Sequence, residues 1–119
     1  MTGGIAPRRK GSAFECQVVN YLRGAGFPQA AKTLAGASAD RGDIQGVPNT
    51  VLECKAHRAR DLAGWLAEAR QEAENAALTR FAVIAKRRGV ADVAESYAIM
   101  PLWLLAELLR EAQSPRRLP

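Results

Sequence analysis

The chain has 119 residues, enough for one domain with a sizeable core but too few for two. Its 17 Lys and Arg residues outnumber its 12 Asp and Glu residues, and the net charge of +5 favours a polyanionic partner, nucleic acid first, although many small basic proteins are simply soluble. No apolar run approaches the roughly 20 residues that cross a membrane, and residues 1–12 lack the apolar core of a signal peptide. We therefore expect a cytoplasmic protein without membrane contact, in the host cytoplasm if the chain is phage-encoded.

The two cysteines, Cys16 and Cys54, have neither the spacing of a zinc site nor the number needed for a disulfide framework. Free cysteine is among the residue types most often found inside proteins. We therefore expect both to be small buried side chains.

The N-terminal third of the chain predicts a basic arm, a helix and a strand. Residues 1–10 form the flexible arm, and a helix begins at Ser12 and runs to about Arg23, where Gly24-Ala25-Gly26 ends it. A first strand lies within residues 27–34.

The middle of the chain predicts a β-hairpin. Residues 43–47 and 50–56 are two strand-like stretches, and Pro48-Asn49 between them is a tight-turn pair.

The remaining elements alternate between helix and strand. They are a helix over residues 61–78 capped by Asp61, a strand over 80–86, a short strand over 97–100, a helix over 101–112 with Pro101 in its first turn, and a basic tail over 114–119. The order α-β-β-β-α-β-β-α indicates one α/β domain over residues 11–113, with a central mixed sheet flanked by helices.

The second strand of the hairpin carries charges inside an apolar stretch, Val51-Leu52-Glu53-Cys54-Lys55. Side chains alternate between the faces of a strand, so Leu52 and Cys54 face the core while Glu53 and Lys55 share the other face. Asp43 on the neighbouring strand can approach Glu53, and paired carboxylates with a lysine form a hard-cation site suited to phosphodiester hydrolysis. The alternative is a plain cross-strand ion pair on a solvated face.

Glu15 in the first predicted helix has two possible roles. With Ser12 it fits the S-x-x-E capping box. On a helical wheel, however, it falls between Leu22 and Val19, inside the apolar sector that faces the sheet. A third carboxylate aimed at the hairpin favours the metal site.

Four short motifs together resemble a known family: Lys10-Gly11-Ser12-x-x-Glu15, Gly26-Phe27, Gly42-Asp43-Ile44 and Glu53-Cys54-Lys55. They resemble the PD-(D/E)XK nuclease superfamily, and the chain is similar to the archaeal-type Holliday junction resolvases and their phage and bacterial relatives. The similarity spans about residues 8–86. Gly42 stands where the family usually has proline.

The resemblance implies a restriction-endonuclease-like fold and a Mg²⁺-dependent endonuclease that resolves four-way DNA junctions, with Mn²⁺ as a possible substitute. By the same resemblance, Asp43 and Glu53 would be metal ligands, the Cys54 backbone carbonyl a third donor, and Lys55 the catalytic lysine. Glu15 would complete the metal site directly or through water.

The resemblance also implies residues that contact the substrate. Ser38, in the loop before the hairpin, would lie near the scissile phosphate. Contacts to the DNA backbone would come from Arg8, Arg9, Lys10, Arg41, Arg58 and Arg60. His57, two residues past the catalytic lysine, and Gln71, on the polar side of the second helix, are expected to be incidental.

A four-way junction is resolved by two symmetric cuts, and one chain carries one site, so a homodimer with a twofold axis is expected. The last predicted helix is apolar nearly all round, with only Glu107, Arg110 and Glu111 forming a polar strip. Such a helix either closes the core of the monomer or is shared with a partner, with Trp103 as an anchor.

Two other functions are compatible with these residues. One is a repair or restriction-type nuclease with the same chemistry, and the other is a non-catalytic DNA-binding module of the same fold. Comparing cleavage of a four-way junction and a linear duplex distinguishes the junction resolvase from the repair or restriction-type nuclease. A magnesium titration monitored by melting temperature distinguishes it from the non-catalytic module.

Overall fold

The computed structural model describes residues 5–33 and 42–114, with side chains described from residue 11 onward. The elements, in chain order, are α1 (Ile5–Gly24), β1 (Ala31–Lys32), β2 (Ile44–Gln45), β3 (Thr50–Lys55), α2 (Leu62–Asn75), β4 (Arg80–Ala85), a 3₁₀ turn (Val93–Glu95), β5 (Tyr97–Ile99) and α3 (Leu102–Gln113). The predicted order of helices and strands is confirmed.

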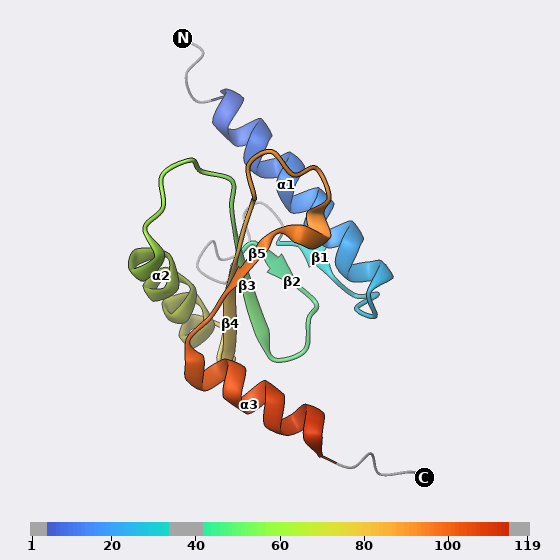
Figure 1. The fold of residues 1–119 in the computed structure, drawn as a ribbon, viewed down its shortest axis with the longest axis vertical. Helices are drawn as coiled ribbons and strands as arrows, with labels where there is room; N and C mark the ends of the chain where they lie inside the picture. The colour runs from blue at the N-terminus through green and yellow to red at the C-terminus, as the bar shows by residue number, and fades with distance from the viewer. Residues whose placement is uncertain (1–4, 34–41, 115–119) are drawn as a thin grey trace.

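The five strands form one mixed sheet in the order β1-β2-β3-β4-β5. β1, β2 and β3 are antiparallel neighbours, whereas β3 and β4 run parallel because the chain crosses over through α2 between them. β5 adds an antiparallel edge strand beside β4. The result is a single α/β domain with helices on both faces of the sheet (Figure 1).

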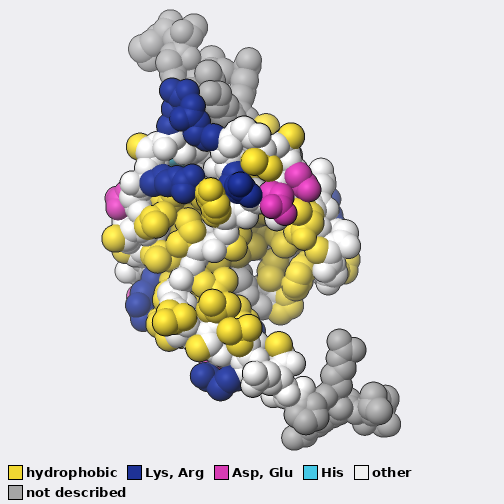
Figure 2. Space-filling view, in the orientation of Figure 1, with side chains coloured by type: hydrophobic (Ala, Val, Ile, Leu, Met, Phe, Trp, Pro, Cys, Tyr) yellow, Lys and Arg dark blue, Asp and Glu magenta, His cyan; other side chains and the backbone are white. Residues whose placement is uncertain are grey.

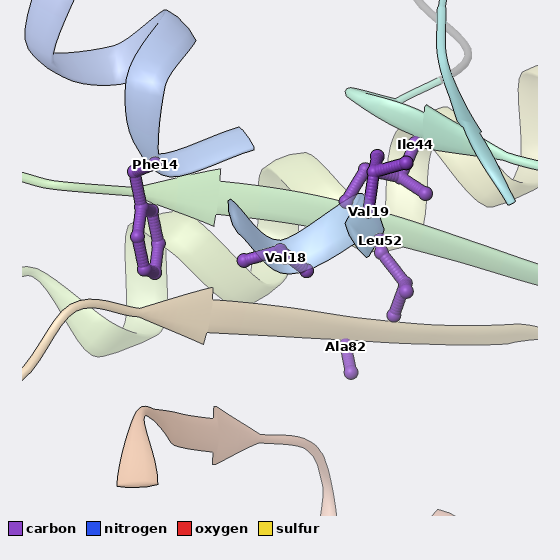
Figure 3. Close-up of a cluster of buried hydrophobic side chains, with 6 residues drawn as sticks. All are labelled: Phe14, Val18, Val19, Ile44, Leu52 and Ala82. Atoms are coloured by element: carbon purple, nitrogen blue, oxygen red, sulfur yellow. The ribbon is translucent and has the colours of Figure 1, made fainter. Parts of the chain in front are cut away.

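The first core layer lies between α1 and the sheet. Phe14, Val18 and Val19 recur at helical spacing and pack on Ile44, Leu52 and Ala82, which come from three neighbouring strands (Figure 3). Removing a buried side chain the size of Phe14 from water contributes roughly 1.5–3 kcal/mol. This packing fixes α1 over the β2–β3 hairpin.

The second core layer lies on the opposite face, under α2. Ala69 and Ala73 of α2 pack on Val51, Phe81 and Val83. Their small size lets the helix lie close to the strands, so polar side chains beside this stripe can reach the sheet. Asp61 caps α2 as predicted, because its side chain accepts a hydrogen bond from the Gly64 N–H at 3.0 Å.

The start of α1 was predicted wrongly. The helix begins at Ile5, so residues 5–10 are helical and do not form the predicted flexible arm. Pro7 falls in the first turn, where its missing N–H breaks no helical hydrogen bond. Ser12 is therefore inside the helix and does not cap it; its hydroxyl accepts a hydrogen bond from Lys32 Nζ at 2.7 Å.

Three smaller predictions also need correction. Cys16 is exposed, not buried, while Cys54 is half-buried. β2 is shorter than predicted because Gly46 has a φ of +88°, and a Cβ there would lie 1.9 Å from the Gln29 carbonyl oxygen. α2 ends at Asn75, before the positive φ of Ala77.

Within the described residues no helix combines the length and apolarity that a membrane crossing requires.

Candidate metal centre

The β2–β3 hairpin holds Asp43 in a fixed position. The Asp43 N–H donates to the Leu52 carbonyl at 3.0 Å, and the Cys54 N–H donates to Asp43 Oδ2 at 2.8 Å. The preceding Gly42 has a φ of +89°, which proline cannot adopt, and a Cβ at this position would lie 2.6 Å from Val51 Cγ1. The local backbone therefore requires glycine at this position.

The predicted alternation along β3 is confirmed, but the face carrying Glu53 is not solvated. Leu52 packs under α1, whereas Val51 packs under α2, and Glu53 lies on the same face as Val51. α2 covers this face and leaves Glu53 only 5% exposed. The alternative of a plain cross-strand ion pair is therefore wrong in placing this face in solvent, although the ion pair between Lys55 and Glu53 is present.

Two further carboxylates come from α2, and the sequence prediction did not include them. Glu68 and Glu72 are four residues apart and so lie on one side of the helix. Each of these residues and Glu53 offers one carboxylate oxygen, and the three oxygens lie within 4.8 Å of one another. The sequence contained a sign of this arrangement. Glu68 and Glu72 directly precede Ala69 and Ala73, the small residues of α2 that pack on the sheet, so both carboxylates lie beside the buried side of the helix.

Lys55 is the cation of this cluster. Its Nζ donates to Glu68 Oε1 at 2.6 Å and lies 3.9 Å from Glu53 Oε2. Burial acts to lower the pKa of Lys55, but the hydrogen bond and the charge of Glu68, with the charges of Glu53 and Asp43, hold it above its usual value. The lysine is therefore an ammonium ion, and its hydrogen bond lowers the pKa of Glu68.

Glu53 is the most perturbed carboxyl group of the cluster. Burial raises its pKa to about 11, with further contributions from the neighbouring Glu72, Asp43 and Glu68. Burial likewise raises the pKa of Glu72, whose Oε2 is buried without a hydrogen-bond partner among the described residues. Two facing carboxylates can only accept, so a proton or a metal cation must lie between them.

Asp43 and Cys54 join this cluster to the hairpin. Burial raises the pKa of Asp43, while the N–H of Cys54, the charge of Lys55 and a hydrogen bond with Glu53 act to lower it. The Asp43 and Glu53 carboxyl groups thus meet across the hairpin, as predicted. Burial and the charge of Asp43 raise the pKa of the Cys54 thiol, so the thiol stays protonated and is a poor metal ligand.

Glu15 lies on the α1 side of the sheet, where the charges of Asp43 and Lys32 act on it. It is half-buried, its Oε1 is 3.7 Å from Lys32 Nζ, and burial followed by the charge of Asp43 raises its pKa. Glu15 is thus partly covered and pairs with Lys32, and its predicted part in the metal site stays a prediction.

Several predicted substrate residues fall outside what the structure describes. These are Ser38 and Arg41 in the loop before the hairpin and the side chains of Arg8, Arg9 and Lys10. Gln71 is exposed and donates to Asn75 Oδ1 at 3.1 Å, away from the carboxylates.

Arg58 and Arg60 follow β3 in the loop that leads to α2, together with His57. The Arg60 guanidinium stacks on the Tyr97 ring at 4.7 Å, and the His57 ring lies 6.5 Å from that of Trp65. These three residues are brought to the end of β3 beyond Lys55 and are not part of the carboxylate cluster.

Comparisons of the chain with family models, with curated proteins and with solved structures gave no significant match.

Proposed function

We propose that this protein is a metal-dependent endonuclease that hydrolyses phosphodiester bonds in four-way DNA junctions. The observation that carries the proposal is the contact of the Asp43 and Glu53 carboxyl groups across the β2–β3 hairpin, with the Lys55 ammonium 3.9 Å from Glu53. These are the residue types that the resemblance to PD-(D/E)XK nucleases assigns to metal binding and catalysis.

The topology supports the same function. An antiparallel β1–β2–β3 meander is followed by a helix and a parallel β4, and the acidic residues lie at the β2–β3 pair. This arrangement is compatible with the restriction-endonuclease-like fold that the resemblance implies. The sequence resemblance raises the expectation of this fold, and the side chains of the centre support the function.

The residues fit a hard divalent cation such as Mg²⁺, with Mn²⁺ as a substitute. The available donors are carboxylate oxygens, a type that Mg²⁺ prefers. Glu53, Glu68 and Glu72 would hold the ion, since their three oxygens lie within 4.8 Å of one another, and Glu72 would use its buried Oε2, which has no partner among the described residues. Asp43, across the hairpin, would be a further ligand, as the resemblance implies. The Cys54 carbonyl and Glu15 are further candidate donors. A bound ion there would polarise a phosphoryl oxygen and lower the pKa of a bound water.

The chain itself supplies position and charge. The Cys54 N–H fixes the Asp43 carboxylate at 2.8 Å, so this ligand is oriented before substrate binds. The Lys55 ammonium, held next to Glu53 and Glu68, can donate to a phosphate oxygen and stabilise the charge that develops during hydrolysis. Water would attack the phosphorus in line and leave a 5′-phosphate.

Two symmetric cuts would require a homodimer, and α3 offers a surface for one. Leu102, Leu105 and Leu109 lie along one side of this helix and are 79%, 41% and 55% exposed. Contiguous exposed apolar side chains of this kind are typical of interaction surfaces.

The proposal is tested with a synthetic four-way junction and a linear duplex of the same sequence. In Mg²⁺ the protein should cut the junction at paired symmetric positions and leave the duplex largely intact, and excess EDTA should abolish cutting. Equal cutting of both DNAs would show that the nuclease is not specific for junctions and has a broader substrate range. Full activity in EDTA would rule out the metal assignment.

A further inference from the structure

A second charged feature lies beyond the carboxylate cluster, between the loops that follow β3 and β4. It is a cavity of about 570 Å³, and its lining includes His57 and Arg58 from the first loop and Lys86, Arg87 and Arg88 from the second. We call this cavity the basic loop pocket. Its volume is within the range of about 300–1,000 Å³ that is typical of ligand sites.

The basic loop pocket lies next to the candidate metal centre. β3 and β4 are parallel, so both loops follow the C-terminal ends of these strands on the same side of the sheet, at the upper end of the molecule in Figure 1. The Lys86 N–H donates to the Lys55 carbonyl at 2.9 Å, which ties the wall of the pocket to the strand end that carries the candidate catalytic lysine. Figure 2 shows Lys and Arg side chains gathered on the upper part of this face.

The two loops are held together by one aromatic ring. The Arg60 guanidinium lies 4.7 Å and that of Arg87 5.3 Å from the centroid of the Tyr97 ring on β5, and Arg87 also lies 3.4 Å from Glu95. Arg60 and Arg87 are therefore engaged within the protein. They fix the shape of the pocket, and their charges are partly satisfied.

The other three cations of the pocket are not neutralised in this way. Among the residues that the structure describes, the side chains of Arg58, Lys86 and Arg88 have no ion-pair or hydrogen-bond partner, and all three are exposed. Three such cations in one concave site repel one another unless an anion lies between them. The fork of a guanidinium matches phosphate oxygens, and an ammonium adds a compact charge.

We propose that the basic loop pocket binds a backbone phosphate of the DNA strand that enters the neighbouring metal centre. Arg58 and Arg88 would grip the phosphate from opposite loops, and Lys86 would add charge beside the end of β3. The assignment of DNA as the ligand rests on the proposed function. A phosphate held here would fix the strand a short distance from Lys55 and set its register before hydrolysis.

The test is binding of a fluorescent four-way junction in EDTA, where no cutting occurs, across a range of salt concentrations. The variant Lys86→Gln with Arg88→Gln should weaken binding at least ~10-fold at moderate salt. It should also reduce the slope of log Kd against log salt by about 0.9 for each phosphate that the protein no longer neutralises. Arg58→Gln, on the other loop, should also weaken binding. Weaker binding in variants of both loops would show that the effect does not come from misfolding of one loop.

The matched control for Arg58→Gln is Arg110→Gln, which removes the same single positive charge on α3, at the far end of the molecule from the pocket (Figure 1). It should leave affinity and salt slope close to those of the wild-type protein. Wild-type affinity and slope in both pocket variants would overturn the proposal, and so would an equal loss in the control. If the pocket variants bound single-stranded RNA more weakly but bound the junction as tightly as the wild-type protein, the proposal would also be overturned.

This experiment separates the pocket from the chemistry. If the wild-type protein binds junctions through the pocket but never cuts them in Mg²⁺, the nuclease proposal fails and the phosphate site stands. If it cuts but the pocket variants bind normally, the nuclease proposal stands and the phosphate site fails.

Discussion

At the scale of single residues, Glu53 stands out as the buried charged-type side chain among the described residues. It is 5% exposed, and its nearest charged neighbours include Glu68, Glu72 and Asp43, with a single lysine among them. A buried carboxylate without a matching cation is strongly unfavourable, so the metal-free protein keeps Glu53 protonated. Local strain or unfavourable charge of this kind is typical of functional sites.

This burial predicts a stabilising substitution. The pKa of Glu53 is about 4.5 in an unfolded chain and about 11 in the fold, so between these values only the native state retains the proton. The contribution of Glu53 to the stability of the metal-free protein therefore decreases as pH rises above about 4.5. Glu53→Gln removes this titration and should stabilise the fold in EDTA by on the order of 2 kcal/mol near neutral pH.

The measurement is chemical denaturation of both proteins in EDTA at pH 5 and pH 8. The advantage of Glu53→Gln should be larger at pH 8. Glu74→Gln, the same change at an exposed position of α2, should have no comparable effect. An advantage of Glu53→Gln that is equal at both pH values would contradict the burial account.

At the scale of elements, local patterns predicted most of the fold. The alternation in β3, the Asp61 cap and the Pro48-Asn49 turn each act over a few residues, so the sequence specifies them directly. The start of α1 was missed because a favourable cap residue, Ser12, lies inside a helix that Pro7 allows to begin earlier. Contacts that depend on distant packing do not follow from local pattern.

The candidate site shows the same division. Asp43 and Glu53 could be placed together because a short hairpin joins them. Glu68 and Glu72 could not, because their position over Glu53 depends on where α2 lies on the sheet. Two small residues of that helix, Ala69 and Ala73, set this close approach, which a carboxylate pattern alone does not reveal.

α3 carries a prediction about assembly. Leu104 anchors its buried side, and the exposed Trp103 ring lies 6.0 Å from that of Phe81, while Leu102 and Leu109 are also exposed. If this face joins two copies, Leu102→Glu with Leu109→Glu should convert a dimer into a monomer, because two charges would be buried in the interface. Sedimentation equilibrium at micromolar concentration measures the change.

The matched control for this assembly test is Leu62→Glu, at an exposed leucine in the first turn of α2, where a carboxylate is well tolerated. It should remain dimeric. A wild-type protein that is monomeric at these concentrations would contradict the proposed use of α3.

At the scale of the whole molecule, acidic and basic side chains form separate groups near the C-terminal ends of β3 and β4. The carboxylates lie under α2 and at the β2–β3 hairpin, and the cations of the basic loop pocket follow directly after β3 and β4. The net charge of +5 and this local acidic centre fit a protein that attracts a polyanion and holds a metal ion where the strand would lie. The central claim is that the acidic centre hydrolyses phosphodiester bonds.

The most direct test of that claim is the single-turnover rate of junction cleavage in Mg²⁺ for the wild-type protein, Asp43→Asn and Glu53→Gln, with Glu74→Gln as a control that makes the same change outside the centre. Asp43→Asn and Glu53→Gln should lose cleavage by ~10³-fold or more while still binding the junction in a gel-shift assay, because they remove metal ligands and leave the basic loop pocket intact. Glu74→Gln should cut at the wild-type rate. Wild-type rates in both Asp43→Asn and Glu53→Gln would contradict the account.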